Sequence, residues 1–595
     1  MVVKTMQAIA AYLLSNRPSF KRAFACFAFA CVAFACLSLA WLPLGMGLST
    51  ASAQLTSLSN PEIIERALKE PPTTKRQDSA PLSLPSLDEA PIGADDITFT
   101  LSALSIMGGE RFSVETLTSL GPPETGAVIS LSALYAFADR ITTYYRTQGY
   151  ALSFALVPAQ EVTDGQVRIE IIEGRIDELI IRERNLSDLA RAHILDAFGR
   201  FAAKGLTRTD DLEEFLLSIN DYPGISAKGI IRPGKKPSSS ALILEIDQRR
   251  QTASTGYQNY LSESLGRDVF LADLAWLGQW SGRDTARLSI RQAPDPKTYK
   301  SLAFDYSSYI DDTNLELYVK LAQSETRPEK GALSDINFTS SAYTQEFGLR
   351  LPLWQRRGSS LFVGGAVRVT NSQSRNDGVP STTDYVRHVT GYADYEAALG
   401  DGASHALRVE FEQGANFFGA RANSREGANL HHSILRLSER YRQPLRFLSV
   451  GQVDATFRAM AQITLSDDAL FANSECSFGG RGFGIGLDAG TLSGEDCLLA
   501  SVQLNWQRPL VGFGPLPPSL FTLLGRLDIG TVRQKGVLVA GEERQQEAIS
   551  AAIGGQFIME SGMTVNIEQA KQLKNEDSPE KEGDITTNIS VNMPF

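Results

Sequence analysis

The C-terminal part of the chain alternates apolar and polar residues in one segment after another, and its polar positions include charges. Between residues 315 and 321, leucine and valine occupy the odd positions, whereas glutamate, tyrosine and lysine occupy the even ones. Residues 407–412 repeat this pattern with arginine and glutamate on the polar side. Successive side chains of a strand point to opposite faces, and a sandwich core would bury these charges unpaired. The alternation therefore predicts a barrel with an apolar outer surface and a polar, water-filled interior, as in outer-membrane barrels.

This alternation begins after residue 250 and continues to the C-terminus, so residues 251–595 are predicted to form an all-β transmembrane barrel. Sixteen antiparallel strands account for this length at about 22 residues each, which leaves room for membrane spans of ~9–11 residues plus connections. A barrel of that size encloses a channel. The predicted strands begin near residues 252, 268, 283, 297, 314, 336, 359, 382, 404, 431, 450, 498, 520, 547, 562 and 586.

The N-terminus has the three parts of a secretory signal. Four basic residues precede an apolar run from Ala23 to Leu48, and the small-residue sequence Ala51-Ser52-Ala53 follows. This order predicts a signal peptide over residues 1–53, cleaved after Ala53. The alternative is a retained membrane anchor, because the apolar run is long enough to span a bilayer.

Residues 54–96 are predicted to form a short helix and an extended linker. The helix would run from Pro61 to Glu70, capped by Asn60 and ended by two prolines. The prolines that follow among serine, threonine and charged residues favour an extended conformation. A single helix on a long tether suits a mobile plug or a docking peptide, and a disordered N-terminus of the mature chain is the alternative.

Two small α+β domains are expected between the linker and the barrel. The first, over residues 97–174, has the order strand, short helix, long helix, strand, strand, with apolar residues at helical spacing between 131 and 145. The second, over residues 175–250, repeats this order after about 75 residues, and such a period indicates a domain-sized repeat.

Composition limits the remaining function classes. The net charge of −11 argues against a general nucleic-acid binder, which needs a basic surface. Five histidines offer little for a metal site, and the adjacent His431 and His432 would point to opposite faces of a strand, so no metal and no cofactor is expected. Paired catalytic carboxylates, a nucleophile motif and a nucleotide-binding motif are not recognisable, so we do not expect an enzyme. Without the signal, Cys476 and Cys497 remain, and they predict one loop disulfide or a reduced pair.

Taken together, these parts resemble the outer-membrane transporters of two-partner secretion, the hemolysin secretion/activation family. The two small domains resemble POTRA (polypeptide-transport-associated) domains. The residues that carry this likeness are Gly149, Tyr150, Pro158, Gln160, Asp164, Gly165, Glu173 and Gly174 in the first domain, and Pro223 and Gly224 in the second. The resemblance covers essentially the whole chain after the signal.

Two barrel motifs of this family are matched. The family has an extracellular loop that folds back into the barrel with a Val-Arg-Gly-aromatic tip, and Gly480, Arg481, Gly482 and Phe483 match it with glycine in place of valine. The second motif is an inward-facing aspartate followed two residues later by glycine, here Asp528 and Gly530, with Arg526 where an aromatic residue or glycine is usual. The resemblance implies an ion pair between Arg481 and Asp528 in the lumen, for which Arg526 would compete.

The resemblance implies a pore in the outer membrane of a Gram-negative bacterium, with its POTRA domains in the periplasm. Its partner would be a large exported exoprotein of the adhesin or hemolysin class, which it would translocate and could also activate. The surrounding membrane lipid and the barrel assembly machinery, which would read the C-terminal Phe595, complete the expected partners; no nucleic acid is among them. The alternatives are an assembly insertase of the same superfamily and, less well supported, a passive porin.

Overall fold

The computed structural model describes residues 64–66 and 91–595, apart from 237, 311–313, 357, 447–451, 511–517, 537, 539–542 and 577–580. The predicted signal peptide and most of the predicted helix and linker therefore lie outside the described residues. Among the described residues, no helix is long and apolar enough to cross a membrane.

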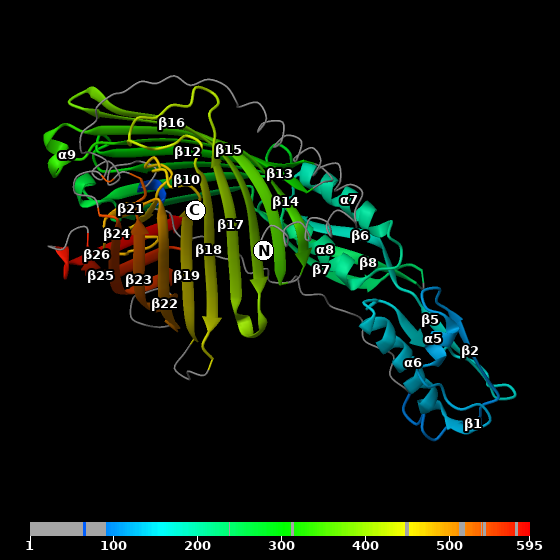
Figure 1. Ribbon diagram of the computed structural model, residues 1–595. Helices are drawn as coiled ribbons and strands as arrows, with labels where there is room; N and C mark the ends of the chain where they lie inside the picture. The colour runs from blue at the N-terminus through cyan, green and yellow to red at the C-terminus, as the bar shows by residue number, and fades with distance from the viewer. Residues whose placement is uncertain are drawn as a thin grey trace. The chain divides into compact units, whose positions relative to one another are not determined.

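The first α+β module has the predicted short helix, long helix and two following strands, with two strands before the short helix and a further short strand between the helices (Figure 1). It contains β1 (Thr98–Thr100), β2 (Ala103–Gly108), α5 (Val114–Thr118), β3 (Val128–Ser130), α6 (Leu131–Thr147), β4 (Phe154–Leu156) and β5 (Gln166–Ile172). Strand β5 lies between β2, which is parallel to it, and β4, which is antiparallel. Helix α6 begins where Ser130 accepts a hydrogen bond from the amide of Ala133, and it buries Phe137, Ile141 and Tyr145 against this sheet.

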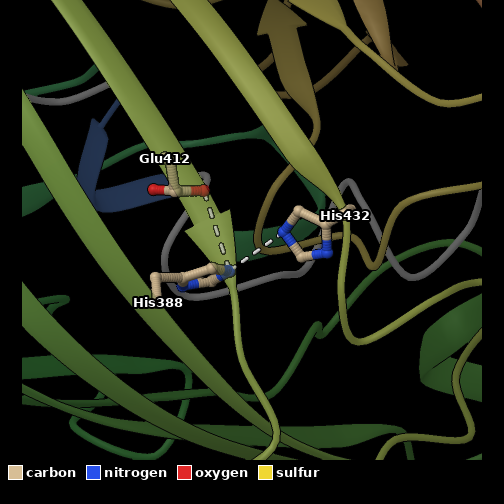
Figure 2. Close-up of side chains that lie close together, drawn as sticks. All are labelled: His388, Glu412 and His432. Carbon is tan, nitrogen blue, oxygen red and sulfur yellow. Dashed lines mark hydrogen bonds and ion pairs between the residues drawn. The ribbon is translucent and has the colours of Figure 1, made fainter. Parts of the chain in front are cut away.

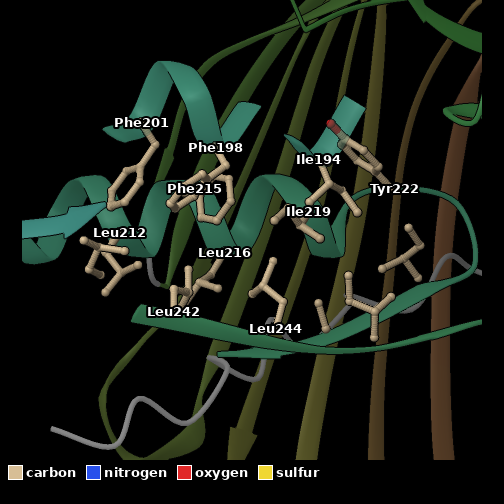
Figure 3. Packing of buried hydrophobic residues seen from close by; sticks show 14 of the residues in the cluster. Ile194, Phe198, Phe201, Leu212, Phe215, Leu216, Ile219, Tyr222, Leu242 and Leu244 are labelled. Carbon is tan, nitrogen blue, oxygen red and sulfur yellow. The ribbon is translucent and has the colours of Figure 1, made fainter. Parts of the chain in front are cut away.

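The second module repeats the three-stranded sheet and the two helices, with longer strands. It contains β6 (Arg175–Arg184), α7 (Asp188–Ala202), α8 (Thr209–Asn220), β7 (Ile225–Pro233) and β8 (Ser239–Gln248), with β8 in the centre of the sheet. Three aromatic rings hold its helices together (Figure 3): Phe201 and Phe215 stack with ring centroids 5.2 Å apart, and Phe198 lies 6.0 Å from each. Leu242 and Leu244 from β8 complete this core.

The remaining strands close into one antiparallel barrel of sixteen, as predicted. Five backbone pairs between β26 and β9 complete the ring. Each of the sixteen predicted strand starts lies within three residues of an observed one. The strands are β9 (Gln251–Gln258), β10 (Val269–Leu277), β11 (Asp284–Gln292), β12 (Tyr299–Ile310), β13 (Leu315–Thr326), β14 (Thr339–Arg356), β15 (Ser359–Asn376), β16 (Val379–Ala398), β17 (Ser404–Gly414), β18 (Ser433–Pro444), β19 (Gln452–Thr464), β22 (Asp496–Leu510), β23 (Ser519–Arg533), β24 (Gln545–Met559), β25 (Thr564–Asn575) and β26 (Ile585–Pro594).

Burial along β23 shows how the alternation is used. The outward-facing Leu527 and Ile529 are 41% and 47% exposed, whereas the lumenal Arg526 and Asp528 are 9% and 0% exposed. The same division into an apolar outer face and a charged inner face places ion pairs on the lumenal wall, such as that between Arg436 and Glu412.

Strand direction fixes which end of the barrel each connection occupies. Because β9 begins directly after the second module and neighbouring strands are antiparallel, the 465–495 connection between β19 and β22 lies at the end opposite to the start of β9. This connection contains a small hairpin of β20 (Cys476–Phe478) and β21 (Leu492–Gly494). Short helical segments α9 (Ala332–Asp335), η1 (Glu263–Leu265) and η3 (Gly400–Gly402) lie in other connections.

Replacing Phe215 with alanine tests the aromatic core of the second module. We expect a loss of about 3–5 kcal/mol in the stability of this module, because a ring packed against two others leaves a cavity. Hydrogen exchange measured on the full chain should show faster exchange of the α8 amides. Glu214→Ala, at an exposed neighbouring position, is the matched control. Equal protection of α8 in both variants would contradict this account of the core.

Candidate functional site

The 465–495 connection folds back into the barrel and lies against the lumenal face of β23. Its base is closed by a disulfide between Cys476 and Cys497, whose Cα atoms are 6.4 Å apart. Phe478 and Leu487 from this loop are buried together with Val532 of β23. We call residues 478–488 of this connection the docked loop.

Asp528 binds the backbone of the docked loop through two amide groups. Its Oδ2 accepts hydrogen bonds from the amides of Gly484 at 3.0 Å and Ile485 at 2.9 Å. Gly484 has a φ of +80°, a conformation that favours glycine and that allows the two adjacent amides to point at one oxygen. The Asp528 side chain is fully buried, and burying a carboxylate without hydrogen-bond partners is energetically costly. The two amide groups of the loop provide such partners.

Arg526, two residues earlier on the same face, binds loop carbonyls. Its Nη1 donates to the carbonyl of Arg481 at 3.0 Å and its Nη2 to the carbonyl of Gly482 at 2.6 Å. The guanidinium also pairs with Asp528, with Nε 2.8 Å from Oδ1 and Nη2 2.8 Å from Oδ2. Arg526 and Asp528 thus form one unit that holds donors and acceptors of the loop backbone at the same time.

Gly530 leaves space for a loop side chain. The ring of Phe478, which is fully buried, lies so close that a Cβ atom on residue 530 would be 2.4 Å from the ring. Three successive lumenal positions of β23 therefore contact the docked loop, and each does so in a different way.

The tip residues contact other parts of the wall. Arg481 Nη1 donates to Gln258 Oε1 at 3.2 Å, and its guanidinium lies over the Tyr260 ring at 5.2 Å. The ring of Phe483 lies 5.6 Å from the guanidinium of Arg458 on β19. The direct pair of Arg481 with Asp528 stays a prediction. The contacts described above connect the two residues through Arg526.

The backbone conformation at position 480 explains why this chain has glycine there. Its φ is +93°, and its amide donates to the carbonyl of Leu487 at 2.9 Å. A β-branched residue such as valine is strongly disfavoured in this conformation. Glycine at this position therefore fits the turn that the tip adopts.

Helical residues 64–66 also lie in the lumen, between the wall and the 465–495 connection. Ile64 is buried against Tyr299 and Ile485, and Glu65 pairs with Arg291 of β11 at 2.8 Å and accepts a hydrogen bond from the Tyr299 hydroxyl. Arg66 donates to the carbonyls of residues 473 and 475, both at 3.2 Å. This short segment is the described part of the predicted plug helix.

The POTRA motif residues occupy turns and close contacts of the two modules. Gly149, Asp164, Gly165 and Gly224 have positive φ, and Cβ atoms on Gly165, Gly174 and Gly224 would lie 2.0–2.3 Å from the carbonyl oxygens of residues 100, 152 and 249, respectively. Gln160 exchanges two 2.8 Å hydrogen bonds with the backbone of Arg168. Pro158 lies in the β4–β5 connection, and Pro223 precedes Gly224 in the turn after α8.

Glu173 and Tyr150 belong to a side-chain cluster around Arg111. Glu173 Oε1 accepts from the Arg111 amide at 2.8 Å and from the Tyr145 hydroxyl at 2.9 Å, while the Tyr150 hydroxyl accepts from Arg111 Nε at 2.6 Å. Burial and the hydrogen bond to Glu173 raise the pKa of Tyr145 above its usual value. Glu173 and Tyr150 therefore hold parts of the first module together through Arg111.

Phe595 lies at the barrel end where β9 begins. It is 74% exposed, and its amide donates to the carbonyl of Ala253 on β9 at 2.7 Å. Its role in barrel assembly stays a prediction.

Sequence reasoning identified the wall positions but missed several of their contacts. It treated Arg526 as a competitor for a carboxylate, whereas the structure shows that it also binds loop carbonyls. The lumenal position of Arg526 follows from the alternation on β23, but its backbone partners do not, because they lie about 45 residues away.

Gly530→Val should displace the docked loop, because the added side chain occupies the position of the Phe478 ring. We expect hydrogen exchange of the Gly484 and Ile485 amides to become faster, since their acceptor is reached only when the loop is docked. Gly525→Ala is the matched control on the outward face of β23, where a Cβ atom meets nothing within 4 Å. Unchanged exchange of both amides in the Gly530 variant would show that the ring does not position the loop.

Known families match most of the chain. Residues 99–174 match the POTRA domain of ShlB type, and residues 239–557 match the family described as haemolysin secretion/activation protein ShlB/FhaC/HecB. The heme/hemopexin transporter protein HuxB of Haemophilus influenzae is 30% identical over 221 residues, which are 36% of this chain and 38% of that protein. The outer membrane transporter CdiB of Escherichia coli O6:K15:H31 is 26% identical over 189 residues, 32% of each chain. These alignments span about a third of the relatives' length.

Solved structures show the same fold over nearly the whole chain. CdiB from Escherichia coli superposes with a TM-score of 0.65 at 17% identity, covering 92% of this chain and 100% of that one. CdiB from Acinetobacter baumannii superposes with a TM-score of 0.58 at 15% identity, covering 87% and 95%. Since the family match covers more than half of the residues, the chain belongs to the haemolysin secretion/activation protein family ShlB/FhaC/HecB.

Proposed function

We propose that this chain is an outer-membrane pore that recognises an exported partner protein and translocates it to the cell surface. The observation that carries the proposal is the docked loop together with residues 64–66. Both are held inside a closed sixteen-stranded barrel by contacts that can break while every strand stays paired. Membership of the family supports the same function, because the compared relatives are transporters.

The contacts inside the lumen suit a reversible gate. Asp528 and Arg526 are buried while the loop is docked, and lumenal water can replace their loop partners when the two separate. Asp528 and Arg526 bind backbone atoms, so a passing polypeptide presents the same amide and carbonyl groups that these side chains already hold. The docked loop and the wall then form an element with two arrangements, which an arriving partner shifts towards the open one.

The two periplasmic modules supply surfaces for capture. The sheet of the second module has β6 and β7 as its edge strands, and that of the first has β2 and β4. An extended segment of an unfolded partner can add to such an edge through backbone hydrogen bonds. The expected partner is a large exoprotein of the adhesin or hemolysin class, and the predicted helix at Pro61–Glu70 would plug the pore until that partner binds.

Secretion by cells tests the proposal. Cells that express a cognate exoprotein with the wild-type pore, Arg481→Ala, Asp528→Ala or Arg526→Ala are compared, with surface display of the barrel measured in each. We expect normal barrel levels and at least ~10-fold less secretion in Asp528→Ala and Arg526→Ala, because losing a buried charged partner weakens loop docking by ~3–5 kcal/mol and leaves a channel that no longer responds to the arriving partner. Arg481→Ala should reduce secretion as well, because its guanidinium also holds the tip to the wall.

The matched control is Arg442→Ala, which removes a lumenal charge whose described ion-pair partner is Asp454. Secretion should stay near the wild-type level in this variant. Unchanged secretion in all three loop–wall variants, with normal display, would contradict the proposed gate. Loss of secretion in the control as well would assign the effect to lumenal charge in general.

A further inference from the structure

Three lumenal side chains that are far apart in the sequence lie close together (Figure 2). His388 lies on β16, Glu412 on β17 and His432 directly before β18, and one ligand atom from each lies within 4.8 Å of the others. The two imidazole Nε2 atoms are 3.2 Å apart, and His388 Nε2 is 3.7 Å from Glu412 Oε1. All three residues are at most 2% exposed.

A glycine between the strands brings the two histidines together. Gly414 on β17 is the backbone partner of His388, and its amide bonds to the carbonyl of His432 on the other side. A Cβ atom on Gly414 would lie 3.0 Å from the His432 ring. Because β17 has glycine at position 414, the two imidazoles can approach each other across this strand. Glu412, two residues earlier on β17, points to the same lumenal face.

The hydrogen bonds around the cluster leave suitable lone pairs at its centre. His432 Nδ1 lies 2.9 Å from the carbonyl of Asn429, so it carries the proton and Nε2 is an acceptor. A ligating histidine typically donates its other ring nitrogen in this way, which fixes the orientation of the ring. His388 Nδ1 makes no hydrogen bond to the described part of the chain, so it can take the ring proton when Nε2 binds an ion, and the bond from His388 Nε2 to His432 is then replaced by the two bonds to the ion.

The spacing of the two imidazole nitrogens fits a tetrahedral ion, and the 3.7 Å between His388 Nε2 and Glu412 Oε1 would shorten slightly when an ion binds. Two nitrogens bound to one zinc ion at ~2.0–2.1 Å lie about 3.3–3.4 Å apart, close to the 3.2 Å seen between the imidazoles. Two imidazoles and one carboxylate are a ligand set typical of Zn²⁺, with the fourth position open to water or a hydroxyl group. The geometry points to a zinc-type divalent metal site formed by His388, Glu412 and His432.

Neighbouring arginines leave one carboxylate oxygen directed at the site. Arg368 and Arg436 contact Glu412 Oε2 at 3.3 and 3.1 Å, and Oε1 faces His388 with a longer 3.4 Å contact from Arg436. A carboxylate has about four lone-pair sites, so it can bind an ion and a guanidinium together. Glu410 and Glu346 pair with the same two arginines and offset their charge.

The site would join the wall to the long connection that contains the docked loop. Ser474 belongs to this connection, and its Oγ lies 3.1 Å from His388 Nε2, within reach of the fourth coordination position. A bound ion would therefore hold β16, β17 and the start of β18 to the connection by one centre. This role is independent of whether the pore translocates a partner.

Metal binding by the purified full chain in detergent tests the site. Protein without a polyhistidine tag is stripped with a chelator and titrated with Zn²⁺ by calorimetry and with Co²⁺ by visible absorption, which reports tetrahedral coordination. We expect one ion per chain and the intense absorption of tetrahedral Co²⁺. His388→Ala and His432→Ala should bind at least ~10-fold more weakly, because each removes a direct ligand.

His431→Ala is the matched control, because this neighbouring histidine is exposed and lies outside the group of three. It should bind like the wild type, and Zn²⁺ should raise the thermal unfolding midpoint of these two proteins but not of the two ligand variants. The absence of stoichiometric binding in the wild type would overturn the proposal and leave a hydrogen-bonded histidine pair. Equal binding by the His388 and His432 variants would place the ion elsewhere and overturn it too.

Discussion

Closure of the sheet by β26 and β9 is the constraint on which the rest of the structure depends. A closed ring leaves no edge strand in the membrane, so the apolar residues can face lipid and the charged ones must face inward. Sixteen strands enclose more space than the side chains of the wall can fill. Whatever closes the channel must therefore come from a connection or from the N-terminal segment, and the structure places both in the lumen.

The docked loop is held mainly through its backbone. Arg526 and Asp528 contact two carbonyls and two amides, so the side chains at the tip are constrained less by the wall than by the conformation of the turn. Glycine at 480 and 484 satisfies positive φ values, and glycine at 530 admits the Phe478 ring. A carboxylate and a guanidinium that bind generic peptide groups are chemically suited to a channel through which another polypeptide passes.

The sequence predicted the barrel well because its alternation repeats in every strand, and each strand start was placed to within three residues. The same alternation placed Arg526 and Asp528 on the lumenal face. It could not predict which loop atoms they bind, because a loop of glycines and turns has no periodicity. The histidines show a second limit: His431 and His432 lie just before β18 and not within a strand, and only His432 is buried. The residues around His432 come from β16 and β17, and only the strand register brings them across Gly414.

The central claim is that the docked loop and residues 64–66 close the channel through contacts with the wall. Single-channel recording in planar bilayers tests this most directly, by comparing the wild type with Arg526→Ala/Asp528→Ala, which removes four hydrogen bonds to the loop backbone. The account predicts small, infrequent openings for the wild type and a larger, longer-lived conductance for the double variant. Equal conductance and open time in the two proteins would contradict it.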